Sequence, residues 1–383
     1  MFSTLRRRLV GASDDDADDP FKESTSTLTK SRRPPNTAFR QQRLKAWQPI
    51  LVPRVVLPML LLVALICVPI GIGFVFATYS IEKLEINYGK CADLASSSFA
   101  DVPSKYVNYH FNGGKSSTVQ WKKTINETDT VCTIQFDIPG DIHGPLYLYY
   151  KLTNFYQNHR KYVESYDWKQ LRGNAVPYDD VSSDCSPMRY RDDKIVYPCG
   201  LVANSMFNDS FSSLTSSSGS EYEFSAKGIA WKSDLSLYKR TKYNTSDIVP
   251  PLNWIEKYPD GYSEEDLDSL AEDERFMNWM KTAALPSFMK LYGKSSEVLA
   301  KGTYTMDIVM RYEVSIFGGT KSVILSTSSV LGGRHFSLGI CYLVVGGLSV
   351  LFMLIFLIKH VFTRKQTDHA FLEGLAGPER EVL

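Results

Sequence analysis

Two long apolar segments dominate the pattern of hydrophobic and polar residues along the chain. The first, Val55–Tyr79, and the second, Phe336–Ile358, contain no charged residue. At a rise of about 1.5 Å per residue the first would form a helix of roughly 37 Å, longer than the ~30 Å hydrocarbon core of a bilayer. Each segment is therefore predicted to be a transmembrane helix. The first begins too late and runs too long for a cleaved signal peptide, so we interpret it as an uncleaved signal anchor. The alternative is a buried helix of a soluble core, but such helices rarely stay apolar on every side over this length.

The intervening segment, Ser80–His335, carries patterns typical of β-strands. Thr130–Ile138 alternates between apolar and polar positions, and Leu146–Asn154 is rich in aromatic residues. Gly302–Leu331 alternates as well, with Gly318-Gly319 predicted as the turn of a hairpin whose second strand is Lys321–Thr327. Further short strands are predicted at Lys194–Cys199 and Gly228–Trp231, and a polar loop at Phe211–Ser220. These strands and short turns favour an antiparallel β-sandwich.

One helix is predicted outside the two apolar segments, over Glu264–Leu285. Ser263 and Asp266 have the spacing of a capping box, and Pro286 is expected to end the helix. The acidic run Glu272–Glu274 is interpreted as a solvated helix face rather than as a metal site. The predicted fold is thus a membrane protein whose two transmembrane α-helices flank a large β-rich ectodomain with helical extensions.

Basic residues next to the two apolar segments predict their orientation. No acidic residue interrupts the stretch before the first segment, and Lys359, Arg364 and Lys365 follow the second. The positive-inside rule then places both termini in the cytoplasm and Ser80–His335 in a lumenal or extracellular space. The basic residues of the first stretch are Arg32, Arg33, Arg40, Arg43, Lys45 and Arg54. The predicted divisions are a disordered tail (1–33), a basic and aromatic juxtamembrane segment (34–54), the first span (55–79), the ectodomain (80–335), the second span (336–358) and a second tail (359–383).

Sequons and cysteines support the same orientation. Asn126, Asn208 and Asn244 begin N-glycosylation sequons, all within the predicted ectodomain. The four cysteines outside the spans also lie there, which in an oxidising compartment indicates two disulfides. Three pairings are possible, and we favour Cys91–Cys132 with Cys185–Cys199 because sequential pairs close the shorter loops. None of these cysteines has the close spacing typical of a zinc site.

The juxtamembrane segment has two interpretations that the residues leave open. Phe39 and Trp47 are interleaved there with Arg40, Arg43 and Lys45. This composition is typical of an ordinary interfacial anchor beside a transmembrane helix. It also suits a docking segment for a cytoplasmic partner.

The sequence offers little chemistry for catalysis or transport. It contains no H-E-x-x-H, G-x-S-x-G or P-loop pattern, and its histidines are scattered. No catalytic, metal or cofactor site is therefore predicted, and a net charge of +1 gives no sign of a nucleic-acid partner. The spans contain no Asp, Glu, Lys, Arg or His, and their ionisable groups are only the weakly acidic thiols of Cys67 and Cys341 and the phenols of Tyr79 and Tyr342, so no translocation pathway is expected. Glycines in both spans indicate either close helix packing or the general enrichment of glycine in membrane helices. They are Gly71, Gly73, Gly339, Gly346 and Gly347.

Several ordered motifs carry a family resemblance. From about Pro34 to Lys359 the chain resembles the cell division control protein 50 and ligand-effect modulator family. The motifs are Asn36–Leu44 with Ala46–Pro49, Tyr147–Ser165, Pro198–Asn208, Gly228–Asp234, and Phe317–Ser322 with Leu331–Gly333. One local departure is Ser329–Gly333, where relatives often have Trp before Leu.

The resemblance implies a non-catalytic β-subunit of a type IV P-type ATPase, a phospholipid flippase. Such a subunit escorts the ATPase out of the endoplasmic reticulum as a chaperone and supports its phosphorylation cycle. The ATPase moves phospholipids from the exoplasmic to the cytoplasmic leaflet, in the Golgi, endosomes or plasma membrane. The family ectodomain is a glycosylated β-sandwich with disulfides between sequential cysteines, which agrees with the favoured pairing. Residues expected to contact the cytoplasmic face of the ATPase are Asn36, Thr37, Phe39, Arg40, Gln41, Gln42, Arg43 and Trp47.

Two other classes of function remain as alternatives. One is a cell-surface glycoprotein receptor or adhesion protein that acts without an ATPase, and the other is a membrane-anchored lumenal enzyme. The stable partner after mild detergent extraction distinguishes the three functions. A large P-type ATPase would support the flippase subunit, and a soluble ligand or a second copy would support the receptor or adhesion protein. Turnover by the isolated ectodomain would support the enzyme.

Overall fold

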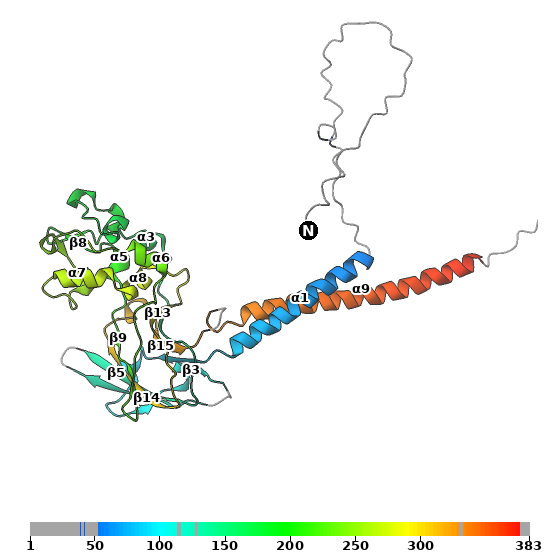
Figure 1. Cartoon of the computed structure of the whole chain (residues 1–383), viewed down its shortest axis with the longest axis horizontal. Helices are drawn as coiled ribbons and strands as arrows, with labels where there is room; N and C mark the ends of the chain where they lie inside the picture. Colours follow the sequence, from blue (N-terminus) through cyan, green and yellow to red (C-terminus); the bar gives the residue numbers. More distant parts are fainter. Residues whose placement is uncertain are drawn as a thin grey trace, which may run out of the picture. The chain divides into compact units, whose positions relative to one another are not determined.

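The two predicted spans are the two longest helices of the structure. The computed structural model describes residues 39, 42, 53–112, 116–126, 129–328 and 332–375. Helix α1 (Pro53–Tyr79) continues through Pro58 and Pro69, and α9 (Ser337–Leu375) starts one residue after the predicted second span and runs past its end. The two helices run side by side (Figure 1). Their apolar stretches, Val55–Tyr79 and Ser337–Phe362, are long enough to cross a membrane, which confirms the two predicted spans.

The first sheet has five antiparallel strands and contains both strands that continue toward the spans. Strand β1 (Lys83–Asn87) is the first strand after α1 in the chain. Its neighbour β15 (Lys321–Ser326) is the last strand before α9. In spatial order the strands are β13 (Phe288–Ser295), β6 (Leu146–Leu152), β15 (Lys321–Ser326), β1 (Lys83–Asn87) and β3 (Val107–His110).

The second sheet has seven strands, all paired antiparallel. Its centre is the long pair of β14 with β5, and the predicted strand Thr130–Ile138 is β5, with the predicted bounds. The strand order is β11 (Glu221–Tyr222), β10 (Leu214–Ser216), β14 (Gly302–Met310), β5 (Thr130–Ile138), β4 (Val119–Ile125) and β2 (Ala100–Asp101), with β9 (Ser210–Phe211) also paired to β14.

One hydrophobic core lies between these two sheets. Every second residue of β6 is buried from Leu146 to Leu152, and Ile134, Phe136 and Ile138 of β5 are buried as well. These side chains belong to a single cluster, as strands with one buried face require. The predicted antiparallel arrangement is therefore confirmed. The short helix α2 (Cys91–Leu94) follows β1, and the Cys91–Cys132 disulfide fastens it to β5 of the other sheet.

A helical extension is inserted between β6 and β13 (Figure 1). It holds a small sheet in which β8 pairs parallel with β12 and antiparallel with β7, and the favoured second disulfide, Cys185–Cys199, forms beside it. The elements are α3 (Arg160–Val163), α4 (Trp168–Leu171), β7 (Tyr190–Arg191), β8 (Lys194–Val196), α5 (Leu201–Asn204), α6 (Lys232–Leu237), β12 (Ile248–Val249), α7 (Glu264–Ala271) and α8 (Glu274–Met280). Single 3₁₀ turns occur at Ser104–Tyr106, Tyr178–Asp180, Ser183–Cys185, Thr245–Asp247, Leu252–Trp254 and Ser315–Phe317.

The predicted helix over Glu264–Leu285 is wrong as a single element, because it is two helices. The capping box of Ser263 and Asp266 begins α7 as predicted, but α7 ends at Ala271. The Asp273 side chain then accepts hydrogen bonds from the amides of Arg275 and Phe276 and begins α8. An Asp that caps a new helix competes with continuation of the old one.

The predicted hairpin around Gly318-Gly319 is also wrong. Strand β14 belongs to the second sheet and β15 to the first, so the intervening residues cross from one sheet to the other. Gly318, at φ +62°, ends the 3₁₀ turn Ser315–Phe317 instead of forming a hairpin turn.

The predictions for two shorter segments are also wrong. Gly228–Trp231 is not a strand, because three of its amides bind a carboxylate. Phe211–Ser220 is not only a loop, since it contains β10 and the end of β9, both of which extend the second sheet.

Candidate functional site

The candidate site begins with the contact between the two spans. Three of the glycines lie at this contact. A Cβ added at Gly71 would lie 2.8 Å from Cγ of Leu343, and one added at Gly346 would lie 2.6 Å from Cγ2 of Val68. Gly339 has an equally close neighbour on α1. Close helix approach is therefore the correct interpretation for these glycines.

The other faces of the two helices are apolar and uncovered within the described chain. Gly73 and Gly347 have no atom within 4 Å of an added Cβ, so they do not serve the α1–α9 contact. Large side chains such as Leu65, Phe76 and Leu351 are at least half exposed. These faces are available to lipid chains or to the helices of a partner protein.

The two spans adjoin, in the chain, two neighbouring strands of the first sheet, since β1 follows α1 and β15 is the last strand before α9. Lys83, the first residue of β1, is paired with Ser326, the last residue of β15. The Thr78 hydroxyl donates to the carbonyl of His335 at 3.3 Å, which joins the ectodomain ends of α1 and α9. The ectodomain ends of both helices thus lie close in the chain to two paired strands of this sheet.

Ion pairs reinforce this connection. Glu85 of β1 accepts from Lys83 and from Lys151 of β6, each at 2.7 Å. Burial alone would raise the pKa of Glu85, but the hydrogen bonds from the two ammonium groups outweigh it and hold the pKa below its usual value.

A fully buried carboxylate joins the extension to the same strands. Asp209 accepts from the Lys321 ammonium at 2.7 Å, the Tyr88 hydroxyl at 2.8 Å, and the amides of Arg311 and Tyr312 at 2.6 Å each. Burial lowers the pKa of Lys321 despite Asp209, and it raises the pKa of Tyr88 well above its usual value. Four donors offset the cost of burying this charge. We call this cluster the Asp209 lock.

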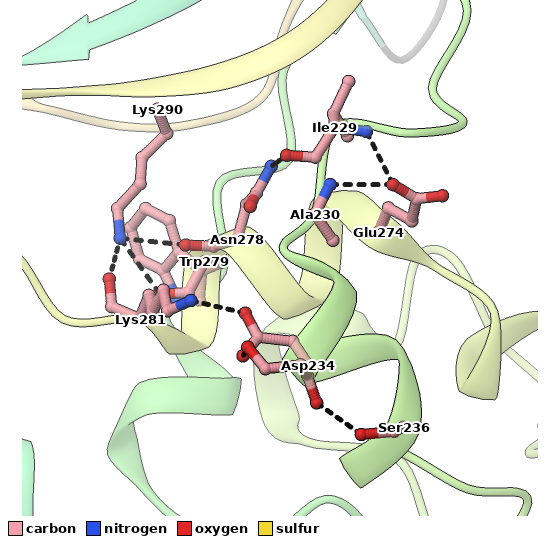
Figure 2. A network of polar contacts seen from close by, with 10 residues as sticks. Ile229, Ala230, Asp234, Ser236, Glu274, Asn278, Trp279, Lys281 and Lys290 are labelled. Carbon is pink, nitrogen blue, oxygen red and sulfur yellow. Dashed lines mark hydrogen bonds and ion pairs between the residues drawn. The ribbon is translucent and has the colours of Figure 1, made fainter. Parts of the chain in front are cut away.

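A second buried carboxylate organises the Gly228–Trp231 segment (Figure 2). Glu274 accepts hydrogen bonds from the consecutive amides of Gly228, Ile229 and Ala230, at 2.8, 2.6 and 2.7 Å. Burial by itself would raise the pKa of Glu274, but the three amides lower it below its usual value. The prediction that Glu272–Glu274 forms a solvated face is wrong for Glu274, which is 6% exposed.

The opposite end of α8 is held by a buried cation (Figure 2). The Lys290 ammonium donates to the carbonyls of Asn278 and Lys281 near the end of α8, where the helix dipole favours positive charge. Burial and the nearby Lys281 lower the pKa of Lys290 to about 8. Lys281 in turn pairs with Asp234 at 2.6 Å and lies 4.5 Å from the centre of the exposed Trp231 ring.

The structure covers the predicted site residues unevenly. Both disulfides favoured from the sequence are formed, with Cα–Cα distances of 6.2 and 5.6 Å. The sequon residues Asn126, Asn208 and Asn244 are all exposed. In the juxtamembrane segment, the Gln42 amide donates to the Phe39 carbonyl at 3.1 Å, and the Phe39 side chain is 74% exposed. The predicted contacts that lie outside the described residues are Asn36, Thr37, Arg40, Gln41, Arg43 and Trp47.

Sequence reasoning missed both buried carboxylates. Asp209 stands inside a sequon and Glu274 inside an acidic run, and each pattern suggests a solvent-exposed residue. Local pattern gave no signal for either residue, because the partners of Asp209 and Glu274 lie far away in the chain. In the part of the chain that the structure describes, no cluster of three or more His, Cys, Asp or Glu side chains is arranged to hold a metal ion.

Comparison with known proteins identifies the family. The model of the LEM3 (ligand-effect modulator 3) family / CDC50 family matches residues 74–366. The chain is 46% identical over 91% of its length to the phospholipid-transporting ATPase accessory subunit CRF1 of Saccharomyces cerevisiae, and covers 91% of that protein. It is 39% identical over 90% of its length to accessory subunit LEM3 of the same yeast, covering 87% of it, and 37% identical over 89% to cell cycle control protein 50A of Bos taurus, covering 92%. The chain therefore belongs to the LEM3 (ligand-effect modulator 3) / CDC50 family.

Proposed function

We propose that this chain is the accessory, non-catalytic subunit of a phospholipid-transporting ATPase. The observation that carries the proposal is its 46% identity, over 91% of both chains, to an accessory subunit of such an ATPase. The two-span architecture suits this role, because the uncovered apolar faces of α1 and α9 can pack against the helices of a larger membrane protein.

Orientation and cellular role extend this proposal. The basic flanks of the spans support cytoplasmic termini and a lumenal or extracellular ectodomain, and the three exposed sequon asparagines support glycosylation there. We expect the subunit to accompany its ATPase from the endoplasmic reticulum to the Golgi, endosomes or plasma membrane. The ATPase would move phospholipid from the exoplasmic to the cytoplasmic leaflet.

Three zones are expected to contact the ATPase. The ectodomain would cover its loops on that side of the membrane, the two spans would pack beside its helices, and the segment Asn36–Trp47 would lie along its cytoplasmic face. The last zone combines cationic and aromatic side chains, including the exposed Phe39. Such side chains are typical of binding hot spots.

Co-purification from cells that express the full chain with a type IV P-type ATPase tests the proposal. Recovery of a stoichiometric complex with lipid-stimulated ATP hydrolysis is expected, and recovery of only a soluble ligand or a second copy would favour the receptor interpretation. Replacing Arg40, Arg43 and Trp47 with Ala should weaken assembly or turnover. Replacing Ser24, Thr25 and Ser26 in the tail serves as the control. If deletion of Pro34–Trp47 leaves both assembly and turnover unchanged, the docking role of that segment is wrong.

A further inference from the structure

A cavity of about 350 Å³ lies where the first sheet meets the ectodomain ends of the two spans. One wall comes from side chains of β6, β13 and β15, including Tyr149, Met289 and Ile324. The other wall is the Gly333–His335 segment that leads into α9. This cavity is separate from the Asp209 lock and from the network around Glu274.

The lining of the cavity is cationic. Lys83, Lys151 and Arg334 line it together with His335, and no Asp or Glu does. Four other cavities of the described chain provide a contrast, because each has at least two carboxylates in its lining. The charge of this cavity is thus a local property and not a feature of the whole surface.

The positive charge is only partly compensated. Lys83 and Lys151 share the single carboxylate of Glu85, and neither ammonium is fully buried. Within the described residues Arg334 has no carboxylate partner, and its Nε is buried without a hydrogen-bond acceptor. A buried guanidinium nitrogen without an acceptor is costly, and an anion in the cavity would relieve that cost.

The position of the cavity next to the ends of the two spans indicates where its anion would come from. Arg334 and His335 immediately precede the apolar stretch Ser337–Phe362, and Lys83 follows shortly after the end of α1 at Tyr79. These positions fall at the boundary between hydrocarbon and water, where lipid headgroups lie. Tyr149 adds an aromatic side chain of the kind found at membrane interfaces, and Met289, which is 42% exposed, adds an apolar one beside it.

We propose that this cavity binds the phosphate of a phospholipid headgroup from the leaflet on the ectodomain side of the membrane. Arg334 supplies the planar donor group that matches phosphate oxygens, and Lys151 supplies a second charge. The bound lipid would fix the position of the β-sheet relative to the bilayer surface. This inference rests on the membrane-spanning architecture and does not require the ATPase.

The test uses the full-length chain in detergent micelles, purified without an ATPase so that no transport site contributes. Two fluorescent probes are compared by anisotropy: a short-chain phosphatidic acid and the matched diacylglycerol, which lacks only the phosphate. The wild type should bind the phosphatidic acid at least about tenfold more tightly, the effect of one charge-assisted hydrogen bond. The double variant Arg334→Gln, Lys151→Gln should lose that difference.

Matched variants keep the result interpretable. Lys301→Gln removes an exposed ammonium elsewhere and should retain the full preference, while Arg334→Lys keeps the charge and should retain part of it. Thermal unfolding of each variant verifies that it is folded. Equal binding of the two probes by the wild type would overturn the proposal. So would full displacement of phosphatidic acid by equimolar inorganic phosphate, which would indicate a site for free anions. A photo-crosslinker at Met289 that captured no phosphatidic acid in the same ATPase-free micelles would overturn it as well.

Discussion

Glu274 illustrates how a single side chain replaces secondary structure. The Gly228–Ala230 amides point to its carboxylate and therefore do not need strand partners. The residue also begins α8, where the helix dipole favours a negative charge. One carboxylate thus fixes a loop and a helix to each other, and the loop that it holds is part of a motif, Gly228–Asp234, that carries the family resemblance.

Glu274→Ala should destabilise the chain by about 3 kcal/mol, because it leaves buried amides without an acceptor. Thermal unfolding of the full-length protein measures the loss. Glu272→Ala is the matched control, since Glu272 is exposed and its ion pair within the described residues is with the exposed Lys227 at 3.0 Å. That change should cost less than about 1 kcal/mol. Equal losses in the two variants would contradict the assigned role of Glu274.

The same variant has a defined pH dependence. The pKa of Glu274 in the folded chain lies below its ordinary value of 4.5, so the stabilisation is complete above that pH. This stabilisation is lost as the pH falls through the lower pKa that Glu274 has in the folded chain. The stability difference between wild type and Glu274→Ala should therefore shrink in acid.

Among the secondary-structure elements, regular sequence patterns predicted structure best where one local property decided the outcome. Uniform apolarity predicted α1 and α9, and the alternation of apolar and polar residues predicted β5. Predictions failed where contacts between residues far apart in the sequence determine the structure. Nothing local shows that β14 and β15 join different sheets, or that Asp273 caps a second helix. The Asp209 lock was also beyond local pattern, because Tyr88, Asp209 and Lys321 are far apart in the chain.

The contact between α1 and α9 gives a prediction for two adjacent glycines. Gly346→Val should destabilise the helix pair by about 1–3 kcal/mol, because its Cβ would meet Val68. Gly347→Val is the matched control, since an added Cβ there has no described atom within 4 Å. Thermal unfolding in detergent compares the two. The contact is assigned wrongly if Gly347→Val is as destabilising as Gly346→Val in the absence of an ATPase.

For the whole molecule, the central feature is the short connection between the membrane helices and the ectodomain core. Strands β1 and β15 lie side by side and lead to α1 and α9, and the Asp209 lock holds their other ends against the extension through Tyr88 and Lys321. A change at the membrane surface is thus separated from the extension by only these two strands. This arrangement suits a subunit that contacts one partner both within the membrane and outside it.

The two disulfides should differ in how much of the molecule they stabilise. Cys91–Cys132 closes a separation of 41 residues and joins α2, which follows β1 of the first sheet, to β5 of the second sheet, whereas Cys185–Cys199 closes 14 residues within the extension. Loop-closure entropy then predicts that replacing Cys91 and Cys132 by serine lowers the free energy of unfolding by about 4 kcal/mol. Replacing Cys185 and Cys199 should lower it by about 3 kcal/mol. Hydrogen exchange should separate the variants further. Replacing Cys91 and Cys132 should raise exchange across β1 and β5, and replacing Cys185 and Cys199 should raise it only in the extension. If both variants raise hydrogen exchange only in the extension, the Cys91–Cys132 disulfide is not what holds the two sheets together.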